Sequence, residues 1–296
     1  MKLTMLGTGN AIVTECYNTC FVLSDEDLHF LIDGGGGNTL LYQLKHVGIN
    51  WKDIHHIFVT HKHIDHLLGI IWMIRLICQG MCRNMYDGEV NIYGHEEVIS
   101  ILEDMSMQLF NEKETSFISK RLHFVIVYDK ETKMILSKKV TFFDIHSTKD
   151  KQFGFCMNLG NNQKLTCCGD EPYNEYEKEY VEGCTWLLHE AFCLYSEKDI
   201  FKPYEKHHST VKDACCLAQE MNVKNIVLYH TEDKNIKNRK ELYINEGKQY
   251  YKGNIYVPND LEEIEFDKNS IEEQNIIKTA GILLNKKIYS DSFTQV

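Results

Sequence analysis

The chain has 296 residues, of which 43 are acidic and 32 are Lys or Arg, so its formal net charge is −11 at pH 7. This balance disfavours electrostatic binding to nucleic acid, because such binding depends on Lys and Arg facing phosphates. The length can bury a large core, and no composition change or proline-rich linker divides the chain. We therefore expect one large domain over residues 1–267 and a C-terminal extension over 268–296 that could form one helix.

The cysteines and the N-terminus indicate a reduced, cytoplasmic protein. The 11 cysteines form an odd number, and most of them, such as Cys78 and Cys156, lie in apolar sequence. No CxxC pair is present, so a cysteine-based zinc site is not expected. The first residues read as a strand and a glycine turn rather than a signal peptide. We find no apolar run of about 18 residues that would span a membrane.

Apolar and β-branched residues predict the elements in chain order. The first part is expected to hold strands at 2–7, 19–24, 27–32, 54–59 and 90–93, and helices at 38–46, 70–79 and 96–110. The rest is expected to hold strands at 122–128, 134–136, 140–145, 153–159, 164–168, 185–188, 225–229, 255–256 and 264–266, and helices at 171–181, 211–221 and 236–251. This alternation in two halves is typical of an α/β protein.

The most informative segment is the run HKHIDH, which directly follows a predicted strand. Imidazole and carboxylate groups suit zinc and similar metals. On a loop that leaves a strand, His61 and His63 can face one metal ion. Asp65 and His66 can then face a second ion, about 3.5–4 Å away. A solvated turn is the alternative reading, but turns favour Gly, Asn or Asp rather than three histidines.

Three later positions share one context, because each is a metal-binding residue type at the end of an apolar strand. They are His146, Asp170 and His230. Strand ends at one edge of a sheet can converge across a long separation in sequence. A lone histidine at a strand end is usually not a ligand, so the prediction depends on the HKHIDH run. Asp33, which precedes four glycines, is expected to hydrogen-bond the metal-binding loop. A phosphate-binding loop is the weaker reading of these glycines, because no Lys-Ser/Thr follows them.

The run HKHIDH resembles the HxHxDH signature of the metallo-β-lactamase superfamily. This resemblance implies an α/β fold, an αββα four-layer sandwich with two mixed sheets, external helices and metals at one sheet edge. It also implies two divalent metal ions, with zinc expected first and manganese or iron as alternatives. In the resemblance, one metal is held by His61, His63 and His146, the other by Asp65, His66 and His230, and Asp170 bridges both.

The segments HEAF and HHST resemble the HEAT and HST motifs of the ribonuclease Z (tRNase Z) group, although HEAF departs in its last residue. The resemblance implies phosphodiester hydrolysis by a hydroxide that bridges the metals, with Asp65 accepting a proton. Glu190 and His208 would then protonate the leaving group, with the carboxylate favouring the cationic imidazole. The alternative reading is that HHST caps the following helix, which is compatible with catalysis.

The substrate is less well defined than the chemistry. The ribonuclease Z group usually carries a tRNA-binding arm between its third and fourth motifs, but His146 and Asp170 are only 24 positions apart. We expect a phosphodiester substrate, with RNA as one candidate, and no membrane partner. The resemblance alone suggests a homodimer. The alternatives are a small-molecule phosphodiesterase, a lactone or thioester hydrolase, a redox di-iron protein and a metal-free scaffold that binds a partner.

Overall fold

The computed structural model describes residues 1–266. The chain divides into two compact units, Met1–Ile264 and Glu265–Val296, and the fold below is that of the first unit. The domain boundary predicted at 267/268 and the helix predicted in 268–296 lie outside the described residues.

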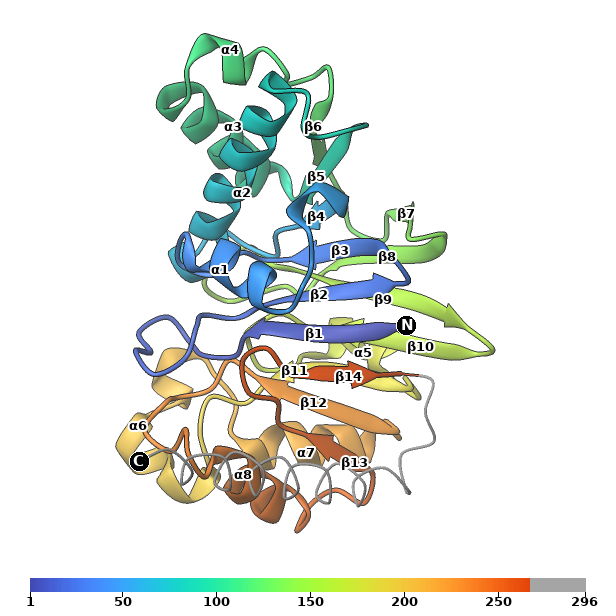
Figure 1. Cartoon of the computed structure of the whole chain (residues 1–296). Coiled ribbons are helices and arrows are strands. Elements are labelled where there is room, and N and C mark those ends of the chain that lie inside the picture. The colour runs from blue at the N-terminus through green and yellow to red at the C-terminus, as the bar shows by residue number, and fades with distance from the viewer. Residues whose placement is uncertain (267–296) are drawn as a thin grey trace, which may run out of the picture. The chain divides into compact units, whose positions relative to one another are not determined.

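The first sheet has seven strands with mixed directions (Figure 1). Its strands are β1 (Lys2–Gly7), β2 (Cys20–Asp25), β3 (Leu28–Ile32), β4 (Ile54–Phe58), β5 (Val90–Gly94), β6 (Leu122–Ile126) and β14 (Glu263–Glu265). They lie in the order β14-β1-β2-β3-β4-β5-β6. The pairs β1–β2 and β2–β3 are antiparallel, and β3 to β6 pair in parallel. Its helices are α1 (Thr39–His46), α2 (Ile64–Cys82), α3 (Glu96–Leu109) and α4 (Glu112–Thr115), with the turn η1 (Trp51–Asp53).

The second sheet also has seven strands. They are β7 (Thr132–Ile135), β8 (Lys138–Asp144), β9 (Phe153–Gly160), β10 (Gln163–Cys167), β11 (Trp186–Glu190), β12 (Asn225–Tyr229) and β13 (Asn254–Tyr256). Their order is β13-β12-β11-β10-β9-β8-β7, and β10 to β13 pair in parallel. The helical elements of this half are η2 (Glu175–Glu177), α5 (Lys178–Val181), η3 (Tyr195–Glu197), α6 (Lys198–Phe201), η4 (Tyr204–Lys206), α7 (Val211–Glu220) and α8 (Arg239–Gly247).

Aromatic side chains fill the space between the two sheets. Phe58 of β4 lies with its ring centroid 4.8 Å from that of Phe142 on β8 and 5.9 Å from that of Phe155 on β9. Phe21 of β2 similarly contacts Tyr229 of β12, at 6.3 Å. Such tilted ring pairs add to the free energy gained from burying apolar area. Through these ring contacts, the inner faces of the two sheets form a single hydrophobic core.

Helices cover the outer faces of both sheets. Apolar side chains of α1, α2 and α3 pack on the first sheet, and those of α7 and α8 pack on the second. In Figure 1, α1 to α4 lie together, as do α6 to α8. The four layers confirm the predicted αββα sandwich.

Most predicted elements agree with the structure to within a few residues, but the helix predicted at 171–181 does not. Only the turn η2 and the short helix α5 form there. Pro172 disfavours helical backbone at the residue before it. The side chain of Asn174 accepts a hydrogen bond from Tyr176 N, which starts the helical turn at residue 175.

Helix α2 has the length and apolar content that a membrane-spanning helix requires, with a mean hydropathy of 1.3, unlike the sequence expectation. Most of it, 67%, is buried inside the protein. Its apolar residues, such as Ile70 and Ile74, pack in the core under the first sheet. Burial in this core explains why the helix is apolar.

Glu177, in η2, is fully buried. Burial raises the pKa of its carboxyl from 4.5 to about 8, although the Cys168 thiol and the Asn174 N–H partly oppose this. Because the folded-state pKa is raised, this carboxyl favours folding below pH about 4, and that contribution is lost as pH rises through about 8.

We therefore expect Glu177→Gln to raise the free energy of unfolding at pH 8.5 by on the order of 2–4 kcal/mol, and to change it little at pH 4.5. Thermal melting of the wild type and the variant at both pH values measures the difference in stability. Glu175→Gln, an exposed neighbour, serves as the control and should not shift the melting temperature. An equal shift for Glu177→Gln at both pH values would contradict the prediction.

Candidate metal centre

Strand ends bring six of the seven predicted ligands together. They fall in two groups, one of His61, His63 and Asp170, and one of Asp65, His66 and His230. The residues follow β4, begin α2, or follow β10 and β12. The two sheets meet at this edge, where Phe153 N donates a hydrogen bond to Thr60 O and Asn10 N donates one to Thr231 O.

Asp170 lies between the two groups. Its Oδ2 is 3.5 Å from His61 Nε2, 3.5 Å from His66 Nε2 and 3.4 Å from His230 Nε2. In the first group, His61 Nε2 and His63 Nδ1 face each other at 2.8 Å. One carboxylate oxygen is therefore within reach of both groups, as a bridging ligand requires.

The donor set fits divalent metal ions. His66 Nε2 is buried and has no hydrogen-bond partner among residues 1–266. It lies 3.4 Å from Asp65 Oδ2 and faces Asp170. A buried nitrogen without a partner is unfavourable, and a cation would use its lone pair. Nitrogen and carboxylate donors without thiolates suit zinc, and also manganese or iron.

Asp33 holds the metal-binding loop, which confirms its predicted role. Its carboxylate accepts hydrogen bonds from Thr60 N and Thr60 Oγ1, both at 2.8 Å, and lies 2.8 Å from His66 Nδ1. Thr60 Oγ1 is in turn 2.9 Å from His61 Nδ1. Contacts of this kind fix the orientation of a ligating imidazole.

Two further residues that hold the ligands were not predicted from the sequence. Thr19 Oγ1 lies 3.2 Å from His230 Nδ1, and the Gln152 amide donates a hydrogen bond to Asp170 Oδ1. Both are ordinary polar residues in loops or at strand starts, so no local sequence pattern distinguishes them.

The pKa values of two groups at this centre are strongly shifted. Burial alone would raise the pKa of Asp170, but His61 and other nearby imidazoles hold it well below its usual range. Burial would lower the pKa of His66, but the carboxylates of Asp65 and Asp33 raise it well above its usual range. A metal ion that binds His66 must therefore displace its proton, so acid weakens metal binding.

His146 is the one predicted ligand that the structure does not bring to the centre. It follows β8 at the expected sheet edge, but its φ of +52° turns the chain at this point. Its side chain is exposed, and its ring lies 4.0 Å from that of Tyr176. The nearby residue that contacts the first group is instead Asp150, whose Oδ2 is 3.1 Å from His63 Nε2.

The two residues predicted to protonate the leaving group lie beside the two groups of candidate metal ligands. Glu190 ends β11, and His208 lies between η4 and α7 with its ring 5.2 Å from that of His230. Phe192 stacks on the His208 ring at 4.9 Å. Thr210 caps α7 through a capping box, so the HHST segment has the predicted capping role as well.

The side chains of Glu190 and His208 lie close together but do not form a hydrogen bond. His208 Nδ1 is 3.8 Å from Glu190 Oε2, too far for a hydrogen bond. Glu190 instead accepts hydrogen bonds from the backbone of Ser209 and Phe192. Burial, with His230 nearby, lowers the pKa of His208 to about 3, and burial raises that of Glu190 well above its usual range. These shifts favour the neutral forms of both side chains in the protein alone, so a cationic His208 stays a prediction for the enzyme with its substrate.

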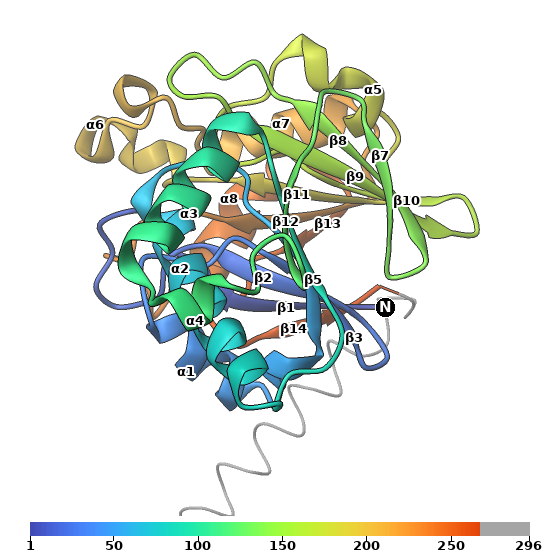
Figure 2. The same cartoon turned by 90° about the horizontal axis from the view of Figure 1, so that it is seen from above.

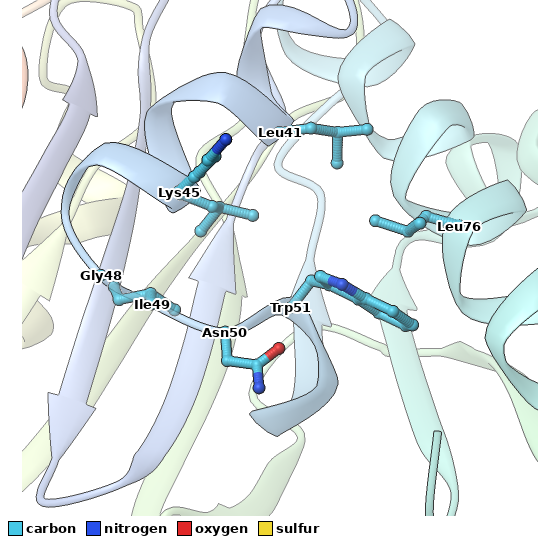
Figure 3. Close-up of a pocket in the computed structure, with 8 residues that line it drawn as sticks. Leu41, Lys45, Gly48, Ile49, Asn50, Trp51 and Leu76 are labelled. Atoms are coloured by element: carbon cyan, nitrogen blue, oxygen red, sulfur yellow. The ribbon is translucent and has the colours of Figure 1, made fainter. Parts of the chain in front are cut away.

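An apolar groove of about 400 Å³ lies elsewhere on the unit, between α1, η1 and α2 (Figure 3). Leu41, Trp51 and Leu76 line it, and Lys45 is its charged side chain. Leu76 lies 11 residues after Asp65 in α2, roughly 16 Å along the helix axis. The groove contains none of the predicted ligands, so it is separate from the metal centre.

Comparison with known proteins identifies the family. A family model described as "Anti-Pycsar protein Apyc1" matches residues 1–250. The chain belongs to this Apyc1 family. The Apyc1-family chain is also 26% identical to the ribonuclease Z of Methanocaldococcus jannaschii, over 91% of this chain and 98% of that protein.

Solved structures show the same fold. The metallo-β-lactamase fold protein YhfI from Bacillus subtilis superposes with a TM-score of 0.72 at 15% identity, covering 89% of this chain and 98% of YhfI. The short form of human tRNase Z superposes with a TM-score of 0.68 at 20% identity, covering 90% of this chain and all (100%) of that chain. The predicted resemblance to the metallo-β-lactamase superfamily and its ribonuclease Z-like group is confirmed, and this Apyc1-family chain is a metal-dependent hydrolase.

Proposed function

We propose that the chain hydrolyses phosphodiesters at a centre of two divalent metal ions, with zinc as the expected metal. The observation that carries the proposal is the pair of ligand groups that share Asp170. His61 and His63 would hold one ion, and Asp65, His66 and His230 the other. When bound, the ions would activate a water nucleophile and stabilise the charge that builds up on the phosphate.

The residues of the chain supply the proton transfers. Asp65 would take up a proton from the attacking water. His208 lies on the same sheet edge and would protonate the leaving oxygen, and Glu190 would orient its ring. Burial lowers the pKa of His208 to about 3 in the protein alone, so the imidazole would gain its proton as the anionic substrate arrives. Catalytic hydrogen bonds are often long without substrate, which is consistent with the 3.8 Å between His208 and Glu190.

A small phosphodiester is the favoured substrate, with precursor tRNA as the second candidate. The names of the ribonuclease Z relatives support RNA as a substrate, but two features of this chain favour a smaller diester. Within residues 1–266, β9 and β10 form a tight hairpin around Asn161 and Asn162, with no long arm. Figures 1 and 2 show this hairpin on the side of the unit opposite α6. The charge of −11 also disfavours a long polyanion.

The test is a side-by-side assay of the zinc-loaded protein on bis(p-nitrophenyl) phosphate, cyclic mononucleotides, precursor tRNA and a lactone. We expect about two ions per chain, and hydrolysis of the small diesters that stops when a chelator removes the metal and returns with zinc. A folded protein that takes up no metal would refute the proposal, as would hydrolysis of the lactone alone. Faster cleavage of precursor tRNA than of any small diester would favour the second candidate.

A further inference from the structure

His63 is the least enclosed of the histidines at the metal centre. Its side chain is 34% exposed, whereas those of His61, His66 and His230 are at most 2% exposed. The two nitrogens of its ring face different surroundings. Nδ1 points into the centre, 2.8 Å from His61 Nε2, and Nε2 points outward, 3.1 Å from Asp150 Oδ2.

Asp150 is held in place by ion pairs. Lys62 Nζ lies 2.7 Å from Asp150 Oδ1 and 2.7 Å from Glu97 Oε1 in the first turn of α3. One Asp150 oxygen therefore contacts Lys62 and the other contacts His63, which fixes the plane of the carboxylate. These contacts join the loop between β8 and β9 to the metal-binding loop and to α3.

We propose that Asp150 is a positioning residue for the metal group of His61, His63 and Asp170. This inference rests on the proposed function. The carboxylate accepts a hydrogen bond from Nε2–H of His63, and so selects the tautomer whose lone pair is on Nδ1, facing the centre. A carboxylate on the outer nitrogen also makes an imidazole a stronger ligand.

The other metal group is held without Asp150. His66 Nδ1 has its own carboxylate partner, Asp33, at 2.8 Å, and His230 Nδ1 has Thr19 Oγ1 at 3.2 Å. Asp33 and Thr19 are both buried. Asp33 also reaches His61 through Thr60, but Asp150 contacts a ligand of the first group alone, His63. We therefore expect loss of Asp150 to lower the affinity for one ion and not for the other.

The test is a zinc titration of the metal-stripped, full-length chain against a chelating dye. For Asp150→Ala we expect one of two ions to bind about 10–100-fold more weakly, with the affinity for the other unchanged. Asp150→Asn keeps an oxygen that can accept the His63 hydrogen bond, so its loss should be smaller. Melting of the metal-free variants checks that each is folded.

Asp25→Ala is the matched control. Asp25 has a similarly exposed side chain (35%) and an ion pair with Lys138 at 3.0 Å, but it lies at the far end of β2. The Asp25→Ala variant should bind both ions with the affinities of the wild type. Unchanged zinc affinities in Asp150→Ala, or equal losses at both sites, would overturn the role of Asp150 and leave the proposed hydrolysis intact. A wild-type chain that binds no metal would overturn the proposed function, and this inference with it.

Discussion

Asp170→Asn is expected to lower kcat/KM for phosphodiester hydrolysis by at least about 1,000-fold, or roughly 4 kcal/mol in the activation free energy. Asp170 Oδ2 is within 3.5 Å of His61, His66 and His230 nitrogens. Asparagine has the same size but no charge, and its amide could place hydrogens where cations should bind. The metal content of the variant should fall along with its rate.

The measurements are metal analysis of the purified variant and its steady-state rate on bis(p-nitrophenyl) phosphate. Asp25→Asn is the control, because its ion pair with Lys138 lies away from the metal centre. Excess zinc should restore little activity to Asp170→Asn, since the shared oxygen is missing. A variant that retains about two ions and works within tenfold of the wild-type rate would show that Asp170 does not bridge the metals.

His208→Ala is expected to affect substrates according to their leaving group. Hydrolysis of a ribonucleotide diester, whose leaving oxygen needs a proton, should slow by about 100–10,000-fold in kcat. p-Nitrophenyl esters, whose leaving group departs readily as an anion, should slow by less than about tenfold. KM should change little for either, because the loss concerns the transition state.

His207→Ala is the neighbouring control. His207 is exposed, and its Nδ1 lies 2.9 Å from Thr148 Oγ1, on the loop that carries Asp150. We expect its rates to remain near those of the wild type for both substrates. Equal losses for the two leaving groups in His208→Ala would point to a structural role of the ring, for example through its stacking on Phe192. No loss at all would remove His208 from the mechanism.

The sequence predicted the parts of the metal centre that depend on local spacing or on strand direction. His61, His63, Asp65 and His66 lie on one short loop and helix start, so their proximity follows from the chain itself. Asp170 and His230 follow strands of the same parallel set, whose carboxyl ends must meet at one edge. Position at a strand end, together with the HKHIDH run, therefore predicted these two residues correctly.

The conformation of the loops could not be predicted in the same way. His146 stands at the correct sheet edge, but a positive φ turns its side chain outward, towards Tyr176. The distance between Glu190 and His208 depends on backbone N–H groups that compete for the same carboxylate. Such choices among nearly equivalent hydrogen-bond partners have no periodic signature in sequence.

The sequence by itself determined the α/β alternation and six of the residues at the candidate metal centre, and its resemblance to the metallo-β-lactamase superfamily implied the αββα sandwich and a hydrolytic chemistry. Strand periodicity and ligand spacing are local properties, so they can be read along the chain. Only the tertiary structure decided that Asp150 rather than His146 contacts His63, a ligand of the first group. It also showed that Lys62, paired with Glu97, holds Asp150 in place. Those contacts join three separate segments, and their energies depend on distances and burial that arise only when the two sheets pack.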